Sequence, residues 1–487
     1  GKPAPGNATR CSWRYRVPRP VQLGSLPIQR WRYESARSPK FAYWGNWKSA
    51  IYIDQPDYFG FKETWVAPLR LKGYRALQGL TTDKRGVLAK KNVSVVLVRD
   101  TNLLDWDATL NKFPYGVMVN SADSGGSFGT NKATLVNLIK RYASAMSCDY
   151  VKLGIVTESY DLSDARQCNE FMSLPHNSRG LRGAGDKASE TWVLKGATTH
   201  GGKAVSLRSH KAIQSIYSGN TKLALKVRSR TVRDEIANKK ARSDLSRKRR
   251  GKAKGKASNG GGGNTEGAES KRSKYCSSKS RRRVEIAQRY VSEMLTLNNR
   301  KFDVRSFVLV ASSKPMLVYV YDQVYFRASL SNLTNTSTAK GQHVTNTHVQ
   351  KKLLRDWEDH IWNPDRVTRY ATEEGLGSDF LRVVQQRIKR SCQFLLDAAT
   401  PSFRHTRHGQ WRLYGFDFVI DKQMQPWLVD TNHFPGFDWT RTPWAKQYAS
   451  EMLGSMWQLL LDVHLGRASR RATPREGEWE LIFNKGK

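Results

Sequence analysis

Alternating hydrophobic and polar positions predict two strands joined by a turn within residues 414–436. Side chains in a strand flip from one face to the other with a period of two. Phe416, Phe418 and Ile420 therefore share one face of the first strand, and Asp417 lies on the other. The pattern predicts an apolar face directed to a core and an opposite face that carries an acid.

The second strand is expected to begin at Pro426, where a missing N–H does least harm. Trp427 and Val429 are expected on its apolar face. Asp430 and Asn432 are two residues apart, so both should lie on the opposite face. This places a carboxylate and an amide together on the polar side of the predicted hairpin.

If the turn closes near residues 422–423, Asp417 lies diagonally opposite Asp430, about 7–8 Å away between backbones. Three oxygen-bearing side chains, those of Asp417, Asp430 and Asn432, would then converge on one face. Oxygen ligands of this kind suit Mg²⁺. The alternative interpretation is a solvated strand face without a ligand.

The remaining periodicity indicates a mixed α and β chain. Apolar residues at helical spacing predict helices at 132–145, 379–398 and 445–466. Apolar runs predict strands at 93–98, 300–310, 317–321 and 324–328. The last two are expected to form a hairpin around Asp322 and Gln323.

Two further stretches carry candidate chemistry. Residues 190–207 are typical of a strand that delivers Lys195, a loop with Gly202, and a second strand. Such a loop can fold its N–H groups over phosphates while the lysine supplies a point charge, although a plain glycine-rich hairpin gives the same pattern. On the strand at 300–310, Asp303 and Arg305 share a face with a lysine, which is costly unless these charges line a site.

The composition indicates folded domains and a polyanionic partner. The chain has 487 residues, of which 39% are hydrophobic, and a formal net charge of +40. Such a charge favours nucleic acid or an acidic protein surface as the partner. No apolar run reaches the roughly 18 residues of a membrane span, so we expect a soluble protein.

The five cysteines are scattered, odd in number and without CxxC spacing. We therefore expect free thiols in a reducing compartment and no zinc site.

Composition also predicts the domain boundaries. The expected parts are an Arg- and Trp-rich arm (1–48), a small α/β domain (49–156), a larger mixed α and β region (157–217 and 284–466), a basic low-complexity insertion (218–283) and a basic, polar C-terminal tail (467–487). The arm has three interpretations: a mitochondrial targeting region, an RNA-binding arm whose aromatic rings stack on bases, or a segment folded over the protein's own surface.

Six motifs, taken in order, resemble the tubulin tyrosine ligase-like family. They are Trp192 to Lys195 with Gly202, Gln288-Arg289-Tyr290, Lys301 to Arg305, Arg327-Ala328-Ser329, His343 to Asn346 followed by Gln350 and Lys351, and Gly415 to Asp417 with Pro426 to Asn432. Residues 128–140 and 157–160 are similar to the segments that open the family's ATP-binding region. The resemblance covers about 128–465, interrupted by the insertion.

The resemblance implies an ATP-grasp fold of the α+β class, with mixed and antiparallel sheets and flanking helices. It implies an enzyme that uses ATP and Mg²⁺ to join an amino acid to an acidic protein tail, such as that of tubulin, through an acyl phosphate. Lys195 and Gly202 would contact phosphates, Gln288, Arg289 and Tyr290 would line the adenine hinge, and Asn346 would contact nucleotide or metal. Asp303, Arg305 and Arg327 would act in catalysis, and Asp417, Asp430 and Asn432 would hold Mg²⁺.

Several residues differ from the family pattern. Asp430 stands where the family usually has Glu, Arg289 where it has Lys, and Ala204 where it tends to have a second glycine. These differences leave open a family member that has lost catalysis.

Two hypotheses follow for the whole chain. The first is a cytoplasmic or cytoskeletal ligase that acts on an acidic tail. The second is a basic component or assembly factor of an RNA-rich particle, such as the mitochondrial ribosome, with ribosomal RNA as partner and the mitochondrial matrix as compartment.

Overall fold

The structure is a computed structural model. It describes residues 11–18, 21–22, 50–53, 61–78, 93–97, 118–120, 129, 131–174, 191–199, 202, 204–217, 276, 285–334, 338–403, 409–437, 440–465, 471–472 and 475–485. The chain divides into two compact units, the first within 1–159, 197–205 and 291–487 and the second within 160–196 and 206–290. Among the residues described, no helix is long and apolar enough to cross a membrane.

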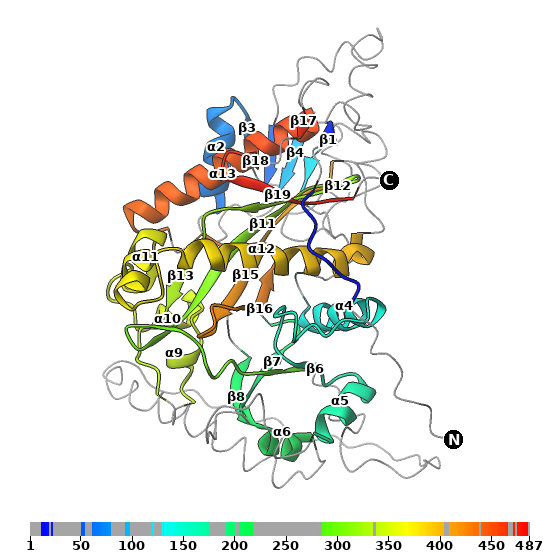
Figure 1. The fold of residues 1–487 in the computed structure, drawn as a ribbon. Helices are drawn as coiled ribbons and strands as arrows, with labels where there is room; N and C mark the ends of the chain where they lie inside the picture. The colour runs from blue at the N-terminus through cyan, green and yellow to red at the C-terminus, as the bar shows by residue number, and fades with distance from the viewer. Residues whose placement is uncertain are drawn as a thin grey trace, which may run out of the picture. The chain divides into compact units, whose positions relative to one another are not determined.

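The first unit is built around one long strand, β11 (Arg300–Ser313), in an antiparallel sheet (Figure 1). Along one edge it pairs with β15 (Arg412–Ile420). Along the other edge it pairs first with β13 (Tyr325–Ala328) and then with β12 (Met316–Tyr321). The predicted hairpin of 317–321 with 324–328 is therefore wrong, because each strand pairs with β11 and not with the other.

The rest of this sheet comes from short segments and the C-terminus. Its other strands are β16 (Pro426–Asn432), β10 (Thr296–Leu297), β14 (Ile361–Trp362), β18 (Arg475–Glu476) and β19 (Trp479–Lys485). Within β19, Trp479, Leu481 and Ile482 are buried. The segment predicted as a basic, polar tail thus contains a strand of the sheet core.

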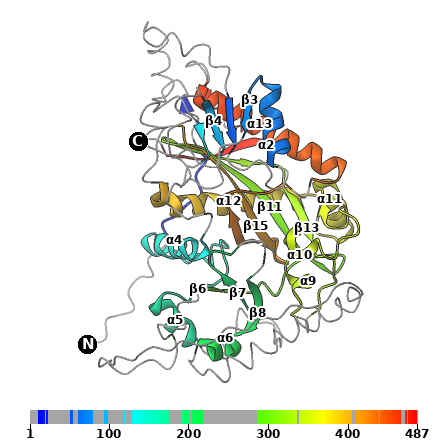
Figure 2. The ribbon, with the colours of Figure 1, turned by 180° about the vertical axis from the view of Figure 1, so that it is seen from behind.

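The two faces of β11 are covered by different helices. One core includes the even-numbered Val304 and Val308 together with Val384 and Ile388 of α12 (Phe380–Ala399). The other core includes Leu309 and residues of α13 (Pro443–Leu465) and α2 (Phe61–Leu71). In Figure 1 α12 crosses in front of β11 and β15, and in Figure 2 these strands lie in front of it. The helices predicted at 379–398 and 445–466 are confirmed to within two residues.

The N-terminal part of the first unit contains a parallel sheet. Its strands, in order, are β3 (Arg75–Gln78), β2 (Ala50–Ile53), β4 (Val93–Leu97) and β5 (Met118–Val119). Trp457 Nε1 in α13 donates to the carbonyl oxygen of Trp65 in α2 at 2.9 Å, which ties this part to the core.

Helix α4 (Lys132–Ala145) matches its predicted bounds and is capped by Asn131, whose side chain accepts from the N–H groups of Ala133 and Thr134. Its Leu135 and Ile139 pack in the same core as α12, so α4 covers the antiparallel sheet of β11 and not the parallel sheet. The remaining elements of the first unit are α9 (Lys340–His343), α10 (Thr347–Gln350), α11 (Pro364–Glu373), a 3-10 helix (Thr400–Phe403), and the pair β1 (Val21–Gln22) and β17 (Arg471–Ala472).

Among the residues that the structure describes, the second unit is a sheet with two helices. Its strand order is β6 (Ser159–Asp161), β9 (Glu285–Arg289), β7 (Thr191–Gly196) and β8 (Val205–Ser209), and its helices are α5 (Ala165–Met172) and α6 (His210–Tyr217). Phe171 and Trp192 meet edge to face in its core, with ring centroids 4.9 Å apart. The predicted basic insertion, residues 218–283, lies outside the described residues except for Cys276.

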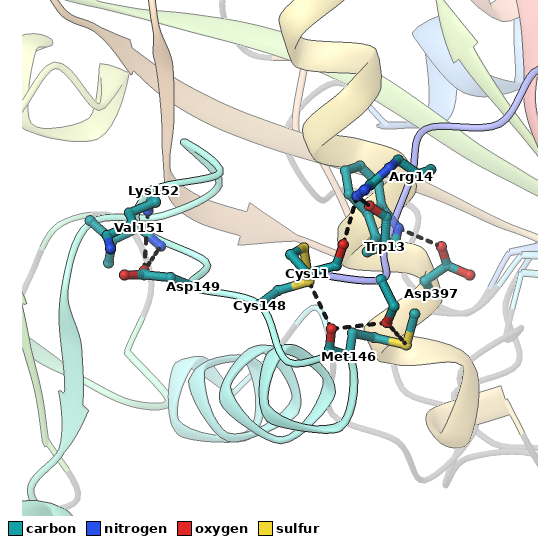
Figure 3. The surroundings of a disulfide bond; sticks show 10 residues. Cys11, Trp13, Arg14, Met146, Cys148, Asp149, Val151, Lys152 and Asp397 are labelled. Carbon is teal, nitrogen blue, oxygen red and sulfur yellow. Dashed lines mark hydrogen bonds between the residues drawn. A yellow bond between two sulfur atoms is a disulfide. The ribbon is translucent and has the colours of Figure 1, made fainter. Parts of the chain in front are cut away.

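Residues 11–18 of the arm lie on the protein's own surface (Figure 3). Cys11 forms a disulfide with Cys148, just after α4. Trp13 is buried, packs edge to face on Phe394 of α12 and donates from Nε1 to Asp397 at 3.1 Å. Of the three interpretations of the arm, this placement favours the third for these residues, because the Trp13 ring is not available to stack on a base.

The prediction of free thiols is wrong for four of the five cysteines. Cys11 pairs with Cys148, and Cys168 pairs with Cys276, which leaves Cys392 as a buried free thiol. The partners are separated by 137 and 108 residues, so no local spacing could indicate the pairs.

Candidate functional site

A row of charged side chains runs across four neighbouring strands of the first unit, in the order β13, β11, β15 and β16. Arg327 on β13 is in register with Asp303 on β11. Two residues along β11, Arg305 is in register with Asp417 on β15, which is in turn opposite Asp430 on β16. The antiparallel register therefore brings together five residues from four strands.

The arginines and aspartates of this row are joined by direct hydrogen bonds. Arg327 donates from Nε and Nη2 to the two oxygens of Asp303, both at 2.7 Å, and its Nη2 lies 2.8 Å from Oδ2 of Asp417. Arg305 donates from Nε to Oδ1 of Asp417, and from Nη2 to Oδ2 at 3.0 Å. Two-pronged guanidinium pairs fix orientation as well as charge.

This cluster is buried, so its charges depend on one another. Burial alone would raise the pKa of Asp417, but the adjacent Arg305 and Arg327 outweigh it and hold that pKa below its usual value. Burial would lower the pKa of Arg327, yet Asp303 and Asp417 raise it well above its usual value. Asp417, Arg305 and Arg327 are therefore ionised at neutral pH.

Gly415 makes room for this arrangement. A Cβ at this position would lie 2.9 Å from Nη1 of Arg305 and 3.1 Å from its Cδ. Any larger residue would push the Arg305 side chain away from Asp417.

The hairpin of β15 and β16 differs from its prediction in register. Asp430 is directly opposite Asp417 and not diagonal to it. Val429 is an extra residue, a β-bulge, between the pairs Asp417–Asp430 and Phe418–Leu428. Leu428, and not Trp427 or Val429, is the residue that reaches the apolar core. Trp427 instead donates from Nε1 to Asp421 at 2.8 Å.

The prediction that Asp430 and Asn432 share the polar face with Asp417 agrees with the register, in which Asn432 lies opposite Gly415. The Asn432 side chain accepts from the N–H of Phe434 at 3.0 Å. The side chain of Asp430 is 35% exposed, so this end of the row is open to solvent.

Sequence reasoning missed Lys132, the first residue of α4. Its Nζ lies 3.2 Å from Oδ1 of Asp430 and donates to the carbonyl oxygen of Thr199 at 3.1 Å. Thr199 belongs to the loop that was predicted to contact phosphates. The signal was present, since Lys132 lies in the stretch 128–140 that resembles the family, but only the structure shows that it reaches Asp430.

Gly202 belongs to the same loop and has a positive φ of 69°. A Cβ there would lie 2.9 Å from Val344 and 4.0 Å from Cβ of Asn346. The loop therefore approaches the segment that carries Asn346 more closely than a side chain would allow.

Thr345 and Asn346 lie in that segment, between α9 and α10. Thr345 donates from its hydroxyl to Oδ2 of Asp303 at 2.5 Å, a contact that sequence reasoning did not identify. Asn346 caps α10, and its side-chain oxygen accepts from the N–H of His348 at 2.9 Å.

Lys301 shares the face of Asp303 and Arg305, as the alternation predicts, and is 8% exposed. Burial lowers its pKa to about 8, against a smaller opposing effect of Asp303. The buried surroundings of Lys301 disfavour its charged form. A buried lysine with a lowered pKa is more typical of a functional site than of a hydrophobic core.

The other four predicted nucleotide residues belong to the second unit. Lys195 on β7 is buried and donates from Nζ to Oε1 of Gln288 on β9 at 2.5 Å. The guanidinium of Arg289 lies 4.5 Å from the ring centroid of Trp192. Tyr290 directly follows β9, and its N–H donates to the carbonyl oxygen of Thr191 at 3.1 Å.

The oxygen donors of the row fit a hard cation such as Mg²⁺. An ionised carboxylate offers about four acceptor positions, and Asp417 uses three of them for the two arginines, which leaves about one for a cation. Asp430 and Asn432 add oxygens on the same face, and such a mixed carboxylate and carbonyl set is typical of Mg²⁺ sites that complete their shell with water and phosphate. Within the part of the chain that the structure describes, no third His, Cys, Asp or Glu joins the two aspartates in a metal-binding group.

Comparison with known proteins agrees with this architecture. Residues 127–456, about two thirds of the chain, match the model of the tubulin-tyrosine ligase family. This range contains every candidate residue described above. The match confirms the resemblance found in the sequence and the ATP-grasp-type α+β fold that it implies.

Curated relatives cover a smaller part of the chain. Tubulin glycylase 3D of Tetrahymena thermophila is 28% identical over 193 residues, which is 38% of this chain and 18% of the relative. Protein polyglycylase TTLL10 of Macaca fascicularis is 34% identical over 31% of this chain and 25% of its own length. Inactive polyglycylase TTLL10 of Homo sapiens is 31% identical over 31% of this chain and 23% of its own length. The chain thus spans a quarter or less of the length of these relatives.

Proposed function

Because the chain belongs to the tubulin-tyrosine ligase family, we propose that it is an ATP-dependent ligase that joins glycine to a carboxylate of an acidic polypeptide. The row of paired charges on β13, β11, β15 and β16 is the observation that carries this proposal. Glycine is favoured because the relatives named above are glycylases or, in one case, an inactive polyglycylase. We propose tubulin as the acceptor because one of these relatives is a tubulin glycylase. If tubulin is the acceptor, the protein acts at the cytoskeleton in the cytoplasm.

The reaction has two steps. A side-chain carboxylate of the acceptor attacks the γ-phosphorus of ATP, which gives an acyl phosphate and ADP. The amine of glycine then attacks the acyl carbon, phosphate leaves with the bonding electrons, and the amine loses a proton as the amide forms. A carboxylate is a poor electrophile until it is phosphorylated, so the first step makes the second feasible.

Arg305 and Arg327 would stabilise the negative charge that develops in both steps, on the phosphoryl oxygens and then on the tetrahedral oxyanion. Their pairing with Asp303 and Asp417 holds the guanidiniums in place before substrate binds, so little reorganisation is needed.

Asp417, Asp430 and Asn432 would hold Mg²⁺, which when bound neutralises charge on the phosphates. Lys132 would share this task as a cation beside Asp430.

The family resemblance also assigns the residues that would hold the nucleotide. Lys195 and Gly202 would contact phosphates, and Gln288, Arg289 and Tyr290 would line the adenine. Asn346 would contact nucleotide or metal from the end of its capping turn. These roles follow the family resemblance, and the family match supports them.

The test is transfer of labelled amino acid. Purified protein is incubated with ATP, Mg²⁺ and tubulin, and with labelled glycine, glutamate or tyrosine in parallel. We expect incorporation of glycine, loss of incorporation in Asp417→Asn, and normal incorporation in Lys422→Gln, which removes an exposed ion pair with Glu293 at the turn of the same hairpin.

Two results would contradict the proposal. Transfer of glutamate or tyrosine in place of glycine would refute the choice of amino acid. If folded protein transferred neither glycine, glutamate nor tyrosine, the proposed ligase activity would be refuted, and the chain would resemble the inactive relative in this respect.

A further inference from the structure

A polar cavity lies on the α12 side of the sheet, the side opposite the charged row. Its volume is about 350 Å³, and it is formed by α12, the loop after α4 and the turn between β15 and β16. It is lined by Leu153, Arg387, Arg390, Ser391, Gln423 and Gln425. None of the roles proposed above uses these residues.

Two cations of α12 have carboxylate partners. Arg382 pairs with Asp379 at 2.8 Å, and Lys389 contacts Asp322 and Glu480, both at 2.7 Å. Their charge is therefore balanced within the protein.

The two arginines that line the cavity are different. Arg387 donates from Nη1 to the backbone carbonyl oxygen of Gln423 at 2.5 Å, and the Arg390 guanidinium lies 5.7 Å from the ring centroid of Trp13. Within the described ranges neither contacts a carboxylate. Two positive charges without an acid thus share one cavity, which fits an anion.

The walls of the cavity are fixed by contacts from several segments. Asp421 accepts from the N–H groups of Gln423 and Gln425 at 2.9 and 2.8 Å, which holds the turn. The Gln425 side chain donates to the carbonyl oxygen of Gly154 at 2.8 Å, which joins the turn to the loop after α4. The disulfide of Cys148 anchors the start of that loop (Figure 3). A preformed cavity lowers the entropic cost of binding.

We infer that this cavity binds a glutamate side chain of an acidic polypeptide and docks the acceptor of the proposed ligase at a distance from the charged row. The inference rests on the proposed function for the identity of the acceptor. Guanidinium groups bind carboxylates by charge-assisted hydrogen bonds, and the Gln423 carboxamide can donate to the same ligand.

The lining favours a peptide over a nucleic acid. Proteins that bind single strands combine positive charge with aromatic rings on which bases stack. No aromatic ring is among the six lining residues, so the cavity offers charge and hydrogen bonds but no stacking surface.

The test is binding of a fluorescein-labelled oligoglutamate peptide, measured by anisotropy without ATP or glycine. Replacing Arg387 and Arg390 together by Gln should weaken binding about tenfold for each guanidinium lost, the effect of removing a charged hydrogen bond. Arg382→Gln, on the same helix, is the matched control and should change binding less than about twofold, as is usual for an exposed pair.

Loss of the Arg387 contact to the turn could by itself unfold the protein. Arg390→Gln alone avoids this, because among the described residues Arg390 makes no hydrogen bond to the turn. Arg390→Lys should keep part of the binding because it keeps the charge. Unchanged affinity in a folded Arg390→Gln variant would overturn the inference.

An oligothymidylate of matched charge serves as competitor. Both the oligonucleotide and unlabelled oligoglutamate are used to displace the labelled peptide from wild type. If the oligonucleotide does so at the lower concentration, the choice of a peptide ligand is overturned. Because binding is measured without catalysis, failure of wild type to transfer glycine would refute the proposed function alone. Glycine transfer with no cavity-dependent peptide binding would refute this inference alone.

Discussion

Two pairs of arginines lie on opposite sides of the same sheet, and they are held in place in different ways. Arg305 and Arg327 are buried on strands and paired with Asp303 and Asp417. Arg387 and Arg390 lie on a helix, contact a backbone carbonyl and an aromatic ring, and have no acidic partner among the described residues. The first pair is ordered by strand register, and the second by segments that join the helix from distant parts of the chain.

The difference has a physical consequence. Removing one member of a buried ion pair leaves its partner charged and unsolvated, which is strongly destabilising. Removing an exposed cation changes stability little but removes charge that a ligand would meet. Substitutions in the two regions should therefore have different effects. Those at the charged row should mainly lower stability, and those at the α12 cavity should mainly weaken binding.

The largest loss of stability is expected when the disulfide that anchors the arm beside the α12 cavity is removed. The disulfide of Cys11 and Cys148 closes a loop of 137 residues, so replacing both by Ser should lower the free energy of unfolding by about 4–5 kcal/mol. Denaturant unfolding of the first unit measures it.

Thiol titration provides the control for that prediction. Unreduced, denatured protein should expose one reactive thiol, Cys392, and reduced protein all five. Five thiols before reduction would contradict both disulfides. Because disulfides persist mainly in oxidising compartments, the same titration on protein from its native source also tests the cytoplasmic setting proposed above.

Asp417→Asn should come next in size. It keeps the shape of the side chain but removes the acidic partner of Arg305 and leaves Arg327 paired with Asp303 alone, so we expect a loss of about 3–5 kcal/mol in stability. Urea unfolding at neutral pH is the measurement, and Lys422→Gln on the same hairpin is the control. A loss no greater than that of the control would show that the row is not a buried charge cluster.

Lys301→Met tests the cost of charge on the same face. The folded pKa of about 8 lies below the ordinary value of 10.5, so the unfolded chain binds more protons between these values and wild-type stability should rise with pH across that window. At pH 7 the substitution should stabilise the fold by up to about 3 kcal/mol and should remove this pH dependence. The free energy of unfolding of both proteins is measured from pH 7 to 10. The same slope of this free energy against pH in wild type and variant would contradict the prediction.

Arg390→Gln should have the smallest effect on stability, within about 0.5 kcal/mol, because the side chain is exposed. Thermal unfolding measures it alongside peptide binding. A loss comparable to that of Asp417→Asn would remove the contrast between the two regions, since Arg390 would then be a structural residue.

The features that could be predicted from the sequence depend on local periodicity. Alternation placed Asp303 and Arg305 on one face of β11, and Asp417 opposite the apolar face of β15. Helical spacing gave the bounds of α4. The order of six short motifs gave the family, which the match over 127–456 confirms.

The features that could not be predicted depend on pairing between distant residues. The extra residue Val429 places Asp430 directly opposite Asp417, and such a bulge is defined by the pairing with β15, which the sequence of one strand does not show. Periodicity also gave no sign that Lys132 reaches Asp430 or that Cys11 reaches Cys148. Such contacts are set by how the elements pack.

The central claim is that the row of paired charges is a ligase centre, and the most direct test is the stoichiometry of a single reaction. With ATP, Mg²⁺, labelled glycine and an acidic acceptor, wild-type protein should release ADP in an amount equal to the glycine incorporated, and Asp417→Asn should release and incorporate none. ADP release without incorporation, or incorporation that survives Asp417→Asn in folded protein, would contradict the account.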